Sequence, residues 1–294
     1  MNGLFLVDKP ADMTSFGVVA RLHRLTNQKC GHSGTLDPLA TGLLPILTGQ
    51  ATKLCDLLTA GKKRYVGTVR FGKRTDTEDI TGNVVEELPW NFTEEDLRRV
   101  LPRFTGQIIQ KPPIYSAIKV DGVPLYRHAR AGREVQAPER TVLIEKIELL
   151  SFDRERGEAT LEVDCSKGTY IRTLFSDLSR ALETCGTMTA LRRTRVGNFS
   201  IEQAVPLEEL MQALEQGKAE PFFVPMEEAL AFLPQYQPED FYATLLRNGC
   251  AVAQEKLKAL PDGLCTVYHH GSLIGLGNKV EKDGETCFKV VTHL

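Results

Sequence analysis

The residues with the clearest chemical potential lie in a glycine-rich loop that covers residues 31–53. Its first half reads GHSGTLDPLATG and contains one imidazole, His32, and one carboxylate, Asp37, five residues later. Apolar Leu36 and Leu39 flank this carboxylate, which makes it either a satisfied structural group or a reactive group in an altered environment. The glycines would let a ligand approach the backbone closely. The loop predicts a ligand-binding site and leaves the reaction undefined.

An aspartate that precedes a proline also has a purely structural interpretation. The pair Asp37-Pro38 is of a type that is common in turns and at the starts of helices. The residues of the loop therefore leave both interpretations of Asp37 open.

The elements that must position this loop are indicated by apolar spacing. Residues 4–8 (LFLVD) predict a buried strand, and Ser15 predicts the N-cap of the helix that follows. Residues 65–71 alternate as the inner and outer faces of a strand do. Thr93 and Asp96 have the spacing of a capping box, which predicts the start of another helix.

The remaining pattern predicts an α+β fold around an antiparallel or mixed sheet, because strand-like runs and amphipathic helices are joined by short links. Composition changes near Leu233-Pro234, and the tail that follows is glycine-rich and strand-like. We expect one large domain, residues 1–234, with a functional or mobile insertion at about 112–140, and a small β-rich domain, residues 235–294.

The charge distribution favours a polyanionic partner more than the net charge of −2 suggests. Residues 61–74 hold six basic residues and no acid. A second basic run passes through Arg127, Arg130 and Arg133, and LRRTR at 191–195 is a third. Such segregation can build a local phosphate-binding face on a nearly neutral protein. The alternative, that each run is an ordinary solvated surface, stays open from the charges alone.

Seven cysteines are scattered along the chain and never form a C-x-x-C pair. They predict reduced thiols, and with no zinc-ligand spacing near a histidine we expect no metal site. The pair His269-His270 is interpreted as solvated. No signal peptide and no membrane-spanning stretch are expected, so the sequence predicts a cytoplasmic protein without a membrane partner.

Six segments of the sequence occur in an order that resembles one known family. They are LVDKPADMTS, GHSGTLDPLATG, KRYVGTVRFG, RTDTEDITG, PPIYSAIKVDGVPLYRHARAG and CSKGTYIRTL, and together they span roughly residues 3 to 200. They are similar to the bacterial tRNA pseudouridine synthase B (TruB) family. The resemblance implies a pseudouridine-synthase-type sheet, mixed and mainly antiparallel and flanked by helices. It also implies a thumb-like insertion at about 112–140 and a small PUA-like C-terminal domain.

The resemblance also implies catalytic roles for three residues. Asp37 would be the nucleophile or charge stabiliser, acting at the ribose C1′ or at C6 of the base. Arg172 would pair with Asp37 and keep it ionised. Tyr65 would stack on the target base and accept a proton from the ribose, and its other interpretation is a core aromatic on the sheet. Isomerisation of a uridine needs no redox change and no group donor, so no cofactor is implied.

The substrate implied by the family is the T-loop uridine of tRNA at position 55, flipped out of the stack. His32 would occupy the space that the flipped base leaves. The other implied contacts are pocket walls and phosphate ligands, namely Tyr170, Leu191, Lys63, Arg64, Arg130 and Arg133.

We expect a monomer that binds the tRNA T arm and needs neither a guide RNA nor a protein partner. Three alternatives remain from the sequence. They are a non-catalytic tRNA-binding or tRNA-folding module on the same scaffold, a guide-RNA-dependent archaeal or eukaryotic relative, and a metal-dependent nucleotide hydrolase.

Overall fold

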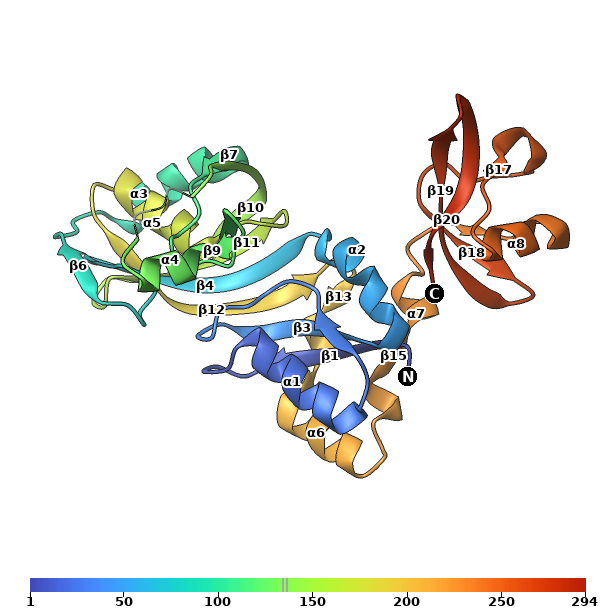
Figure 1. Ribbon diagram of the computed structural model, residues 1–294. Helices are drawn as coiled ribbons and strands as arrows, with labels where there is room; N and C mark the ends of the chain where they lie inside the picture. Colours follow the sequence, from blue (N-terminus) through green and yellow to red (C-terminus); the bar gives the residue numbers. More distant parts are fainter. Residues whose placement is uncertain (134, 136) are drawn as a thin grey trace.

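The computed structural model describes residues 1–133, 135 and 137–294, apart from the side chain of Arg130. One large sheet forms the body of the molecule, and a smaller sheet lies in the C-terminal part (Figure 1). The large sheet follows the order β14-β1-β3-β12-β4-β11-β10-β7. In that order its strands are β14 (Val205–Pro206), β1 (Gly3–Lys9), β3 (Thr41–Thr48), β12 (Gly186–Val196), β4 (Lys63–Phe71), β11 (Glu158–Cys165), β10 (Arg140–Asp153) and β7 (Gly106–Gln110).

Three short strands pair with individual strands of this sheet. They are β2 (Cys30–His32) on β3, β13 (Phe199–Ser200) on β12 and β15 (Phe223–Pro225) on β1. Most neighbours are antiparallel, whereas β12 runs parallel to β3 and β14 runs parallel to β1. The predicted mixed, mainly antiparallel α+β fold is therefore confirmed. Because β12 lies between β3 and β4, it joins the strand that follows the Asp37 loop to the strand that carries Tyr65.

The helices that flank the body are short, and the structure places them at α1 (Ser15–Thr26), α2 (Cys55–Thr59), α3 (Glu94–Val100), α4 (Leu125–Arg130), α5 (Ile171–Ala181), α6 (Leu207–Glu215) and α7 (Met226–Ala229). Short 3₁₀ helices cover Gly49–Leu54, Leu101–Phe104, Ile201–Gln203, Glu220–Phe222 and Gln254–Lys256. The capping box predicted at the start of α3 is confirmed. Within the described part of the chain, no helix combines the length and apolar character that crossing a membrane requires.

The predicted N-cap of α1 is wrong by one residue, and the difference matters for the site. Thr14 is the cap, and its side chain accepts a hydrogen bond from the Gly17 amide. Ser15 is instead buried, and its hydroxyl both donates to the Leu36 carbonyl at 3.0 Å and accepts from the Leu36 amide at 2.8 Å. A serine at the predicted cap therefore holds the residue before Asp37.

The insertion between β7 and β10 contains α4 and the small hairpin of β8 (Lys119–Val120) and β9 (Val123–Pro124). A second hairpin, β5 (Lys73–Thr75) with β6 (Val84–Glu87), extends from the end of β4. Both emerge at the same end of the body in Figure 1.

The C-terminal sheet has the order β16-β18-β19-β20-β17 and packs on α8 (Asp240–Arg247). Its strands are β16 (Gln235–Tyr236), β18 (Cys265–His269), β19 (Ser272–Lys282), β20 (Glu285–His293) and β17 (Val252–Ala253). A small apolar cluster that includes Leu4, Leu47 and Leu276 joins this domain to the body. The Lys53 ammonium also donates to the His293 carbonyl at 2.8 Å across the same junction.

Candidate active site

The Asp37 loop connects β2 to β3 and is fixed on both sides of the aspartate. The Ser15 hydroxyl holds Leu36, and the buried Lys9 ammonium donates to the Pro38 carbonyl at 3.2 Å. The Ala40 amide closes a turn on the Asp37 carbonyl at 3.1 Å. The backbone around Asp37 is therefore held in place, while its side chain keeps 33% of its surface exposed. An immobilised carboxylate that remains accessible is suited to contact with a substrate.

Arg172 is the direct partner of Asp37, which is the pairing that the family resemblance implied. It lies in the first turn of α5 and its side chain is only 4% exposed. Its Nη2 donates to Asp37 Oδ1 at 3.2 Å, and its Nε forms an ion-pair contact of 2.9 Å with Oδ2. Two contacts from a planar guanidinium fix the orientation of a carboxylate as well as its charge.

The rest of the Arg172 guanidinium reaches residues for which the sequence assigned no role. It donates to the carbonyls of Thr77 at 2.8 Å and Tyr115 at 3.1 Å. Its Nη1 also lies 3.9 Å from Oδ2 of the buried Asp79. Arg172 therefore links Asp37 to the β5–β6 hairpin, where Asp79 lies, and to the base of the 112–140 insertion. The segment RTDTEDITG was noted as a family landmark, and only the fold shows why its second aspartate matters.

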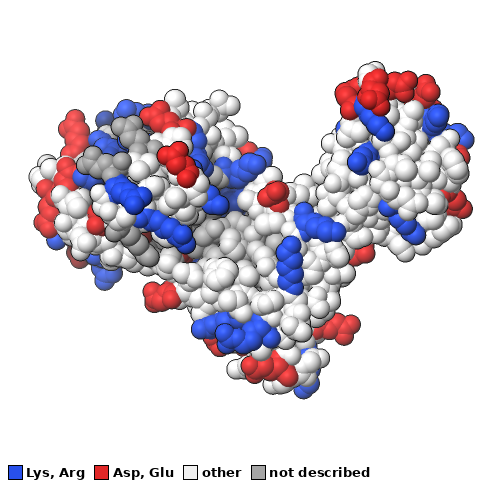
Figure 2. Space-filling view, in the orientation of Figure 1, with Lys and Arg blue, Asp and Glu red and all other residues white. Residues whose placement is uncertain are grey.

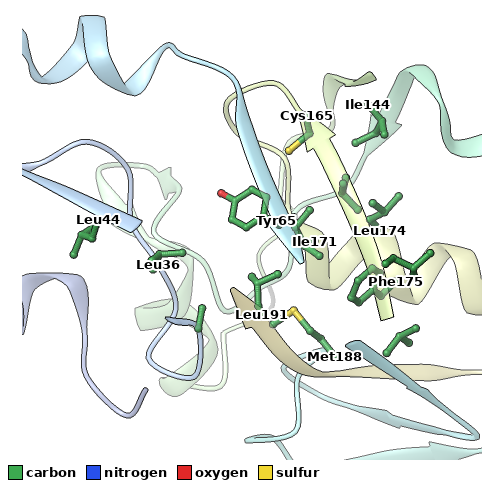
Figure 3. Packing of buried hydrophobic residues seen from close by; sticks show 14 of the residues in the cluster. Leu36, Leu44, Tyr65, Ile144, Cys165, Ile171, Leu174, Phe175, Met188 and Leu191 are labelled. Atoms are coloured by element: carbon green, nitrogen blue, oxygen red, sulfur yellow. The ribbon is translucent and has the colours of Figure 1, made fainter. Parts of the chain in front are cut away.

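Tyr65 lies in β4 and is 7% exposed, with its ring packed among Leu36, Ile171 and Leu191 (Figure 3). Burial raises the pKa of its hydroxyl above the ordinary value of 10, and the neighbouring Arg193 guanidinium opposes that rise. The phenol is therefore neutral near pH 7. Tyr65 is thus part of the core, as one of its two interpretations expected, and its role against the target base stays a prediction.

Arg193 has a structural role that the sequence analysis did not predict, because it treated LRRTR only as a basic run. It is completely buried, and no carboxylate of the described residues forms an ion pair with it. Its Nε donates to the Leu43 carbonyl at 2.8 Å and its Nη2 to the Gly34 carbonyl at 3.1 Å. It therefore holds the Asp37 loop through backbone carbonyls on both sides of the aspartate. Burying a cation costs free energy. The charge of the LRRTR run suggested a solvent-facing surface, but Arg193 of this run lies in the interior.

His32 ends β2 at the start of the Asp37 loop. Burial, reinforced by the Arg193 charge, lowers the pKa of its imidazole below the usual 6.5, so the ring is neutral at pH 7. Its Nδ1 is buried and has no hydrogen-bond partner within the described structure. A neutral, unengaged ring is compatible with stacking against RNA bases.

Tyr170 and Leu191 are the residues that the family resemblance implies as pocket walls, and that role stays a prediction. Tyr170 is the N-cap of α5, two residues before Arg172. The side chain of the buried Gln110 donates to the Tyr170 carbonyl and accepts from the Tyr170 amide. The Arg140 guanidinium lies 5.9 Å above the Tyr170 ring centroid. Leu191 lies in β12 opposite Gly67 and is 8% exposed.

The four basic residues expected at RNA phosphates have different environments. Lys63 is only 6% exposed, and its ammonium donates to the Thr59 and Gly61 carbonyls at 2.8 Å, which does not fit a phosphate contact. Arg64 is engaged by Asp164 in two hydrogen bonds of 2.7 Å. Arg133 is exposed beyond α4, and the side chain of Arg130 lies outside the described residues.

Lysine and arginine side chains are nevertheless numerous on one face of the body. In Figure 2 they form several separate groups over the body, with acidic side chains among them, whereas the tip of the β19–β20 hairpin is acidic. That tip carries Glu281, Asp283 and Glu285. The predicted phosphate-binding face therefore stays a prediction, and Lys63 and Arg193 cannot be part of it because both are buried.

The buried Lys63 makes stability depend on alkaline pH. Burial, with the nearby Arg193 charge, lowers its pKa from 10.5 to about 8. Since the charged form is disfavoured in the folded state, this cost is fully present below pH 8 and is relieved as the pH rises toward 10.5. Lys63→Met should therefore lose part of its relative stability between pH 7 and pH 9.5, as measured by urea unfolding of both proteins at each pH.

The matched control is Lys62→Met, because Lys62 is adjacent and its side chain is 72% exposed. Its free-energy difference from the parent protein should not change over the same pH range. A Lys63→Met difference that is equally independent of pH would contradict the interpretation of Lys63 as a cation with a lowered pKa.

The fold and the site together define the class of protein. Two solved structures have similar folds, entitled "Crystal Structure of a Cbf5-Nop10-Gar1 Complex" and "Crystal structure of the archaeal box H/ACA sRNP Nop10-Cbf5 complex". The first has a TM-score of 0.74 and 27% identity and covers 98% of this chain and 83% of the other. The second has a TM-score of 0.72 and 26% identity and covers 99% and 86%. The fold of this chain is therefore of the pseudouridine-synthase type.

The sequence comparisons identify the family. Residues 22–171 match the N-terminal domain of TruB family pseudouridylate synthases, and residues 172–231 match the C-terminal domain of tRNA pseudouridylate synthase B. The tRNA pseudouridine synthase B of Pseudomonas fluorescens is 42% identical, covering 97% of this chain and 93% of its own. That of Clostridium tetani is 40% identical over the full length of both. The chain therefore belongs to the TruB family.

Proposed function

We propose that this chain isomerises the T-loop uridine of tRNA, at position 55, to pseudouridine. The observation that carries the proposal is the accessible Asp37 carboxylate, which is oriented by a buried arginine inside a TruB-family fold. Relatives at 40–42% identity and near-complete coverage bear the name tRNA pseudouridine synthase B. A module that only bound tRNA would have no use for a buried guanidinium that fixes one carboxylate.

The proposed reaction conserves all atoms of the uridine. The N1–C1′ bond breaks, the freed uracil turns, C5 bonds to C1′, and the proton of C5 is lost while N1 becomes protonated. Asp37 acts as nucleophile or charge stabiliser, at C1′ or at C6. Arg172 holds the carboxylate in a fixed orientation, and the neutral phenol of Tyr65 is suited to stacking on the base and to proton exchange with the ribose.

RNA binding in this proposal uses shape and a few phosphates. His32, which is neutral, fills the space that the flipped base leaves, and Tyr170 with Leu191 walls the pocket. The insertion that carries α4 closes on the T loop, with Arg130 and Arg133 as phosphate ligands. Its base is anchored to the site through the hydrogen bond between Tyr115 and Arg172. A movement of the insertion on closure would therefore reach Asp37 through Arg172.

The proposal further holds that the chain acts as a cytoplasmic monomer without a guide RNA. The similar solved complexes contain Nop10 and, in one case, Gar1, whereas the relatives at 40–42% identity are named as tRNA enzymes. The test is tritium release from C5-labelled uridine in a T-arm stem-loop with this protein alone. We expect complete, stoichiometric release that is unaffected by EDTA.

Each alternative predicts a different result in that assay. A binding-only module would retain the stem-loop and release no tritium, a guide-dependent enzyme would need added RNA and proteins, and a metal-dependent hydrolase would be inhibited by EDTA. A stem-loop whose target uridine is replaced by cytidine is the matched substrate control and should bind without reacting.

A further inference from the structure

The C-terminal domain brings together two histidines and an aspartate that the proposed reaction does not use. His269 ends β18, His270 follows it in the turn to β19, and Asp240 is the first residue of α8. Neighbouring side chains of a strand normally point to opposite faces. Here His270 has a φ of 49°, and the two imidazole rings lie side by side with centroids 4.2 Å apart. The turn therefore presents both rings to α8.

The two rings converge on a single oxygen atom. His269 Nε2 lies 3.4 Å and His270 Nε2 lies 3.3 Å from the same Oδ1 of Asp240. All three potential ligand atoms are within 4.8 Å of one another. Zinc bonds to histidine nitrogen and carboxylate oxygen are about 2.0–2.2 Å long, so two such ligands at a tetrahedral angle are about 3.3–3.4 Å apart. The observed N–O distances match that spacing.

The hydrogen bonding of His269 also suggests a missing partner. Its Nε2 is buried and, among the described residues, has no hydrogen-bond partner, because the Asp240 contact lacks hydrogen-bond geometry. Leaving a buried polar atom unsatisfied is costly. An ion between the three side chains would engage this nitrogen. The Asp240 side chain is 76% exposed, which gives an ion access from solvent and leaves room for a water ligand.

We propose that His269, His270 and Asp240 bind one divalent transition-metal ion, with Zn²⁺ as the best match. Two neutral imidazoles and one carboxylate form a ligand set that suits Zn²⁺ and disfavours the oxygen-preferring Mg²⁺ and Ca²⁺. The ion would tie the start of α8 to the β18–β19 turn. It would therefore stabilise the C-terminal domain, and it is independent of the proposed isomerisation.

The test uses the full-length protein, freed of metal with a chelator that is then removed, and ZnCl₂ as the only added ligand. Calorimetry should show saturable one-to-one binding. The ¹⁵N signals of the His269 and His270 ring nitrogens should shift together, which separates this site from binding at free cysteines. Because only the native state offers the assembled site, zinc should raise the Tm by several degrees. Mg²⁺ at the same concentration should do neither.

Asp240→Asn and His270→Gln should each weaken zinc binding at least about tenfold, since even changes outside the ligand shell have effects of that size. Both variants should also lose the rise in Tm, measured against their own metal-free Tm. Asp262→Asn is the matched control, because Asp262 is a fully exposed acid of the same domain. The proposal is overturned if the two histidine signals do not move at saturating zinc, or if Asp240→Asn binds as tightly as the parent.

Discussion

Asp37→Asn is expected to abolish pseudouridine formation while leaving tRNA binding intact. The amide keeps the shape of the carboxylate and can still accept from Arg172, but it carries no charge and is a poor nucleophile. We expect turnover to fall by at least about 10⁴-fold, the size of loss seen when a covalent catalyst is removed. The measurement is tritium release under single-turnover conditions, alongside the Kd for the T-arm stem-loop.

The control for this variant must separate chemistry from folding. Asp56→Asn changes an exposed aspartate in α2, close in sequence to the catalytic loop, and should have full activity. Asp37→Asn should unfold in urea at nearly the parent concentration, because the Asp37 side chain is partly exposed and its loop is held by Ser15 and Lys9. Full activity in Asp37→Asn would refute the catalytic role, and loss of tRNA binding would indicate a recognition role instead.

Local pattern predicted the elements but not the burial of charge. Residues 65–71 became β4 because alternation is a property of adjacent residues, and the capping box at Thr93 formed for the same reason. The positive charge of the LRRTR run was interpreted as part of the protein surface. The same period of two places Leu191 and Arg193 on one face, and that signal could have indicated a buried arginine. What no pattern showed is that β12 lies between β3 and β4.

The candidate site shows the same division between local and non-local information. The Asp37 loop was recognisable because its residues are contiguous, whereas Asp79 and Tyr115 reach Arg172 only through the fold. The zinc proposal is of the same kind. His269-His270 alone predicted a solvated turn, because the aspartate that completes the set lies on a different element.

Lys63 shows that residue type and neighbourhood along the chain do not determine exposure. Its position beside Arg64 and Tyr65 predicted a phosphate contact, but β4 alternates, and Lys63 lies on the same inward face as Tyr65. Its ammonium therefore satisfies the carbonyls at the end of α2 and in the following turn. Arg64 lies on the outward face and donates two hydrogen bonds to Asp164.

Arg172→Lys is the substitution that best tests how the site is held. Lysine keeps the positive charge but loses the planar fork, so it cannot contact Asp37 while also donating to Thr77 and Tyr115. Misplacement of a catalytic group by about 1 Å can lower the rate about 10²-fold. We therefore expect kcat to fall by at least about that factor, with KM for the stem-loop nearly unchanged, measured by tritium release.

Arg172→Met separates orientation from stability. It leaves the buried Asp79 without its cationic neighbour, and removal of one partner of a buried pair lowers the free energy of unfolding by about 3–5 kcal/mol. Arg180→Lys, an exposed position on the same helix, should change neither activity nor urea stability. If Arg172→Lys were as active as the parent, charge alone would suffice at Asp37. The contacts to Thr77 and Tyr115 would then serve the hairpin and the insertion and not the catalytic carboxylate.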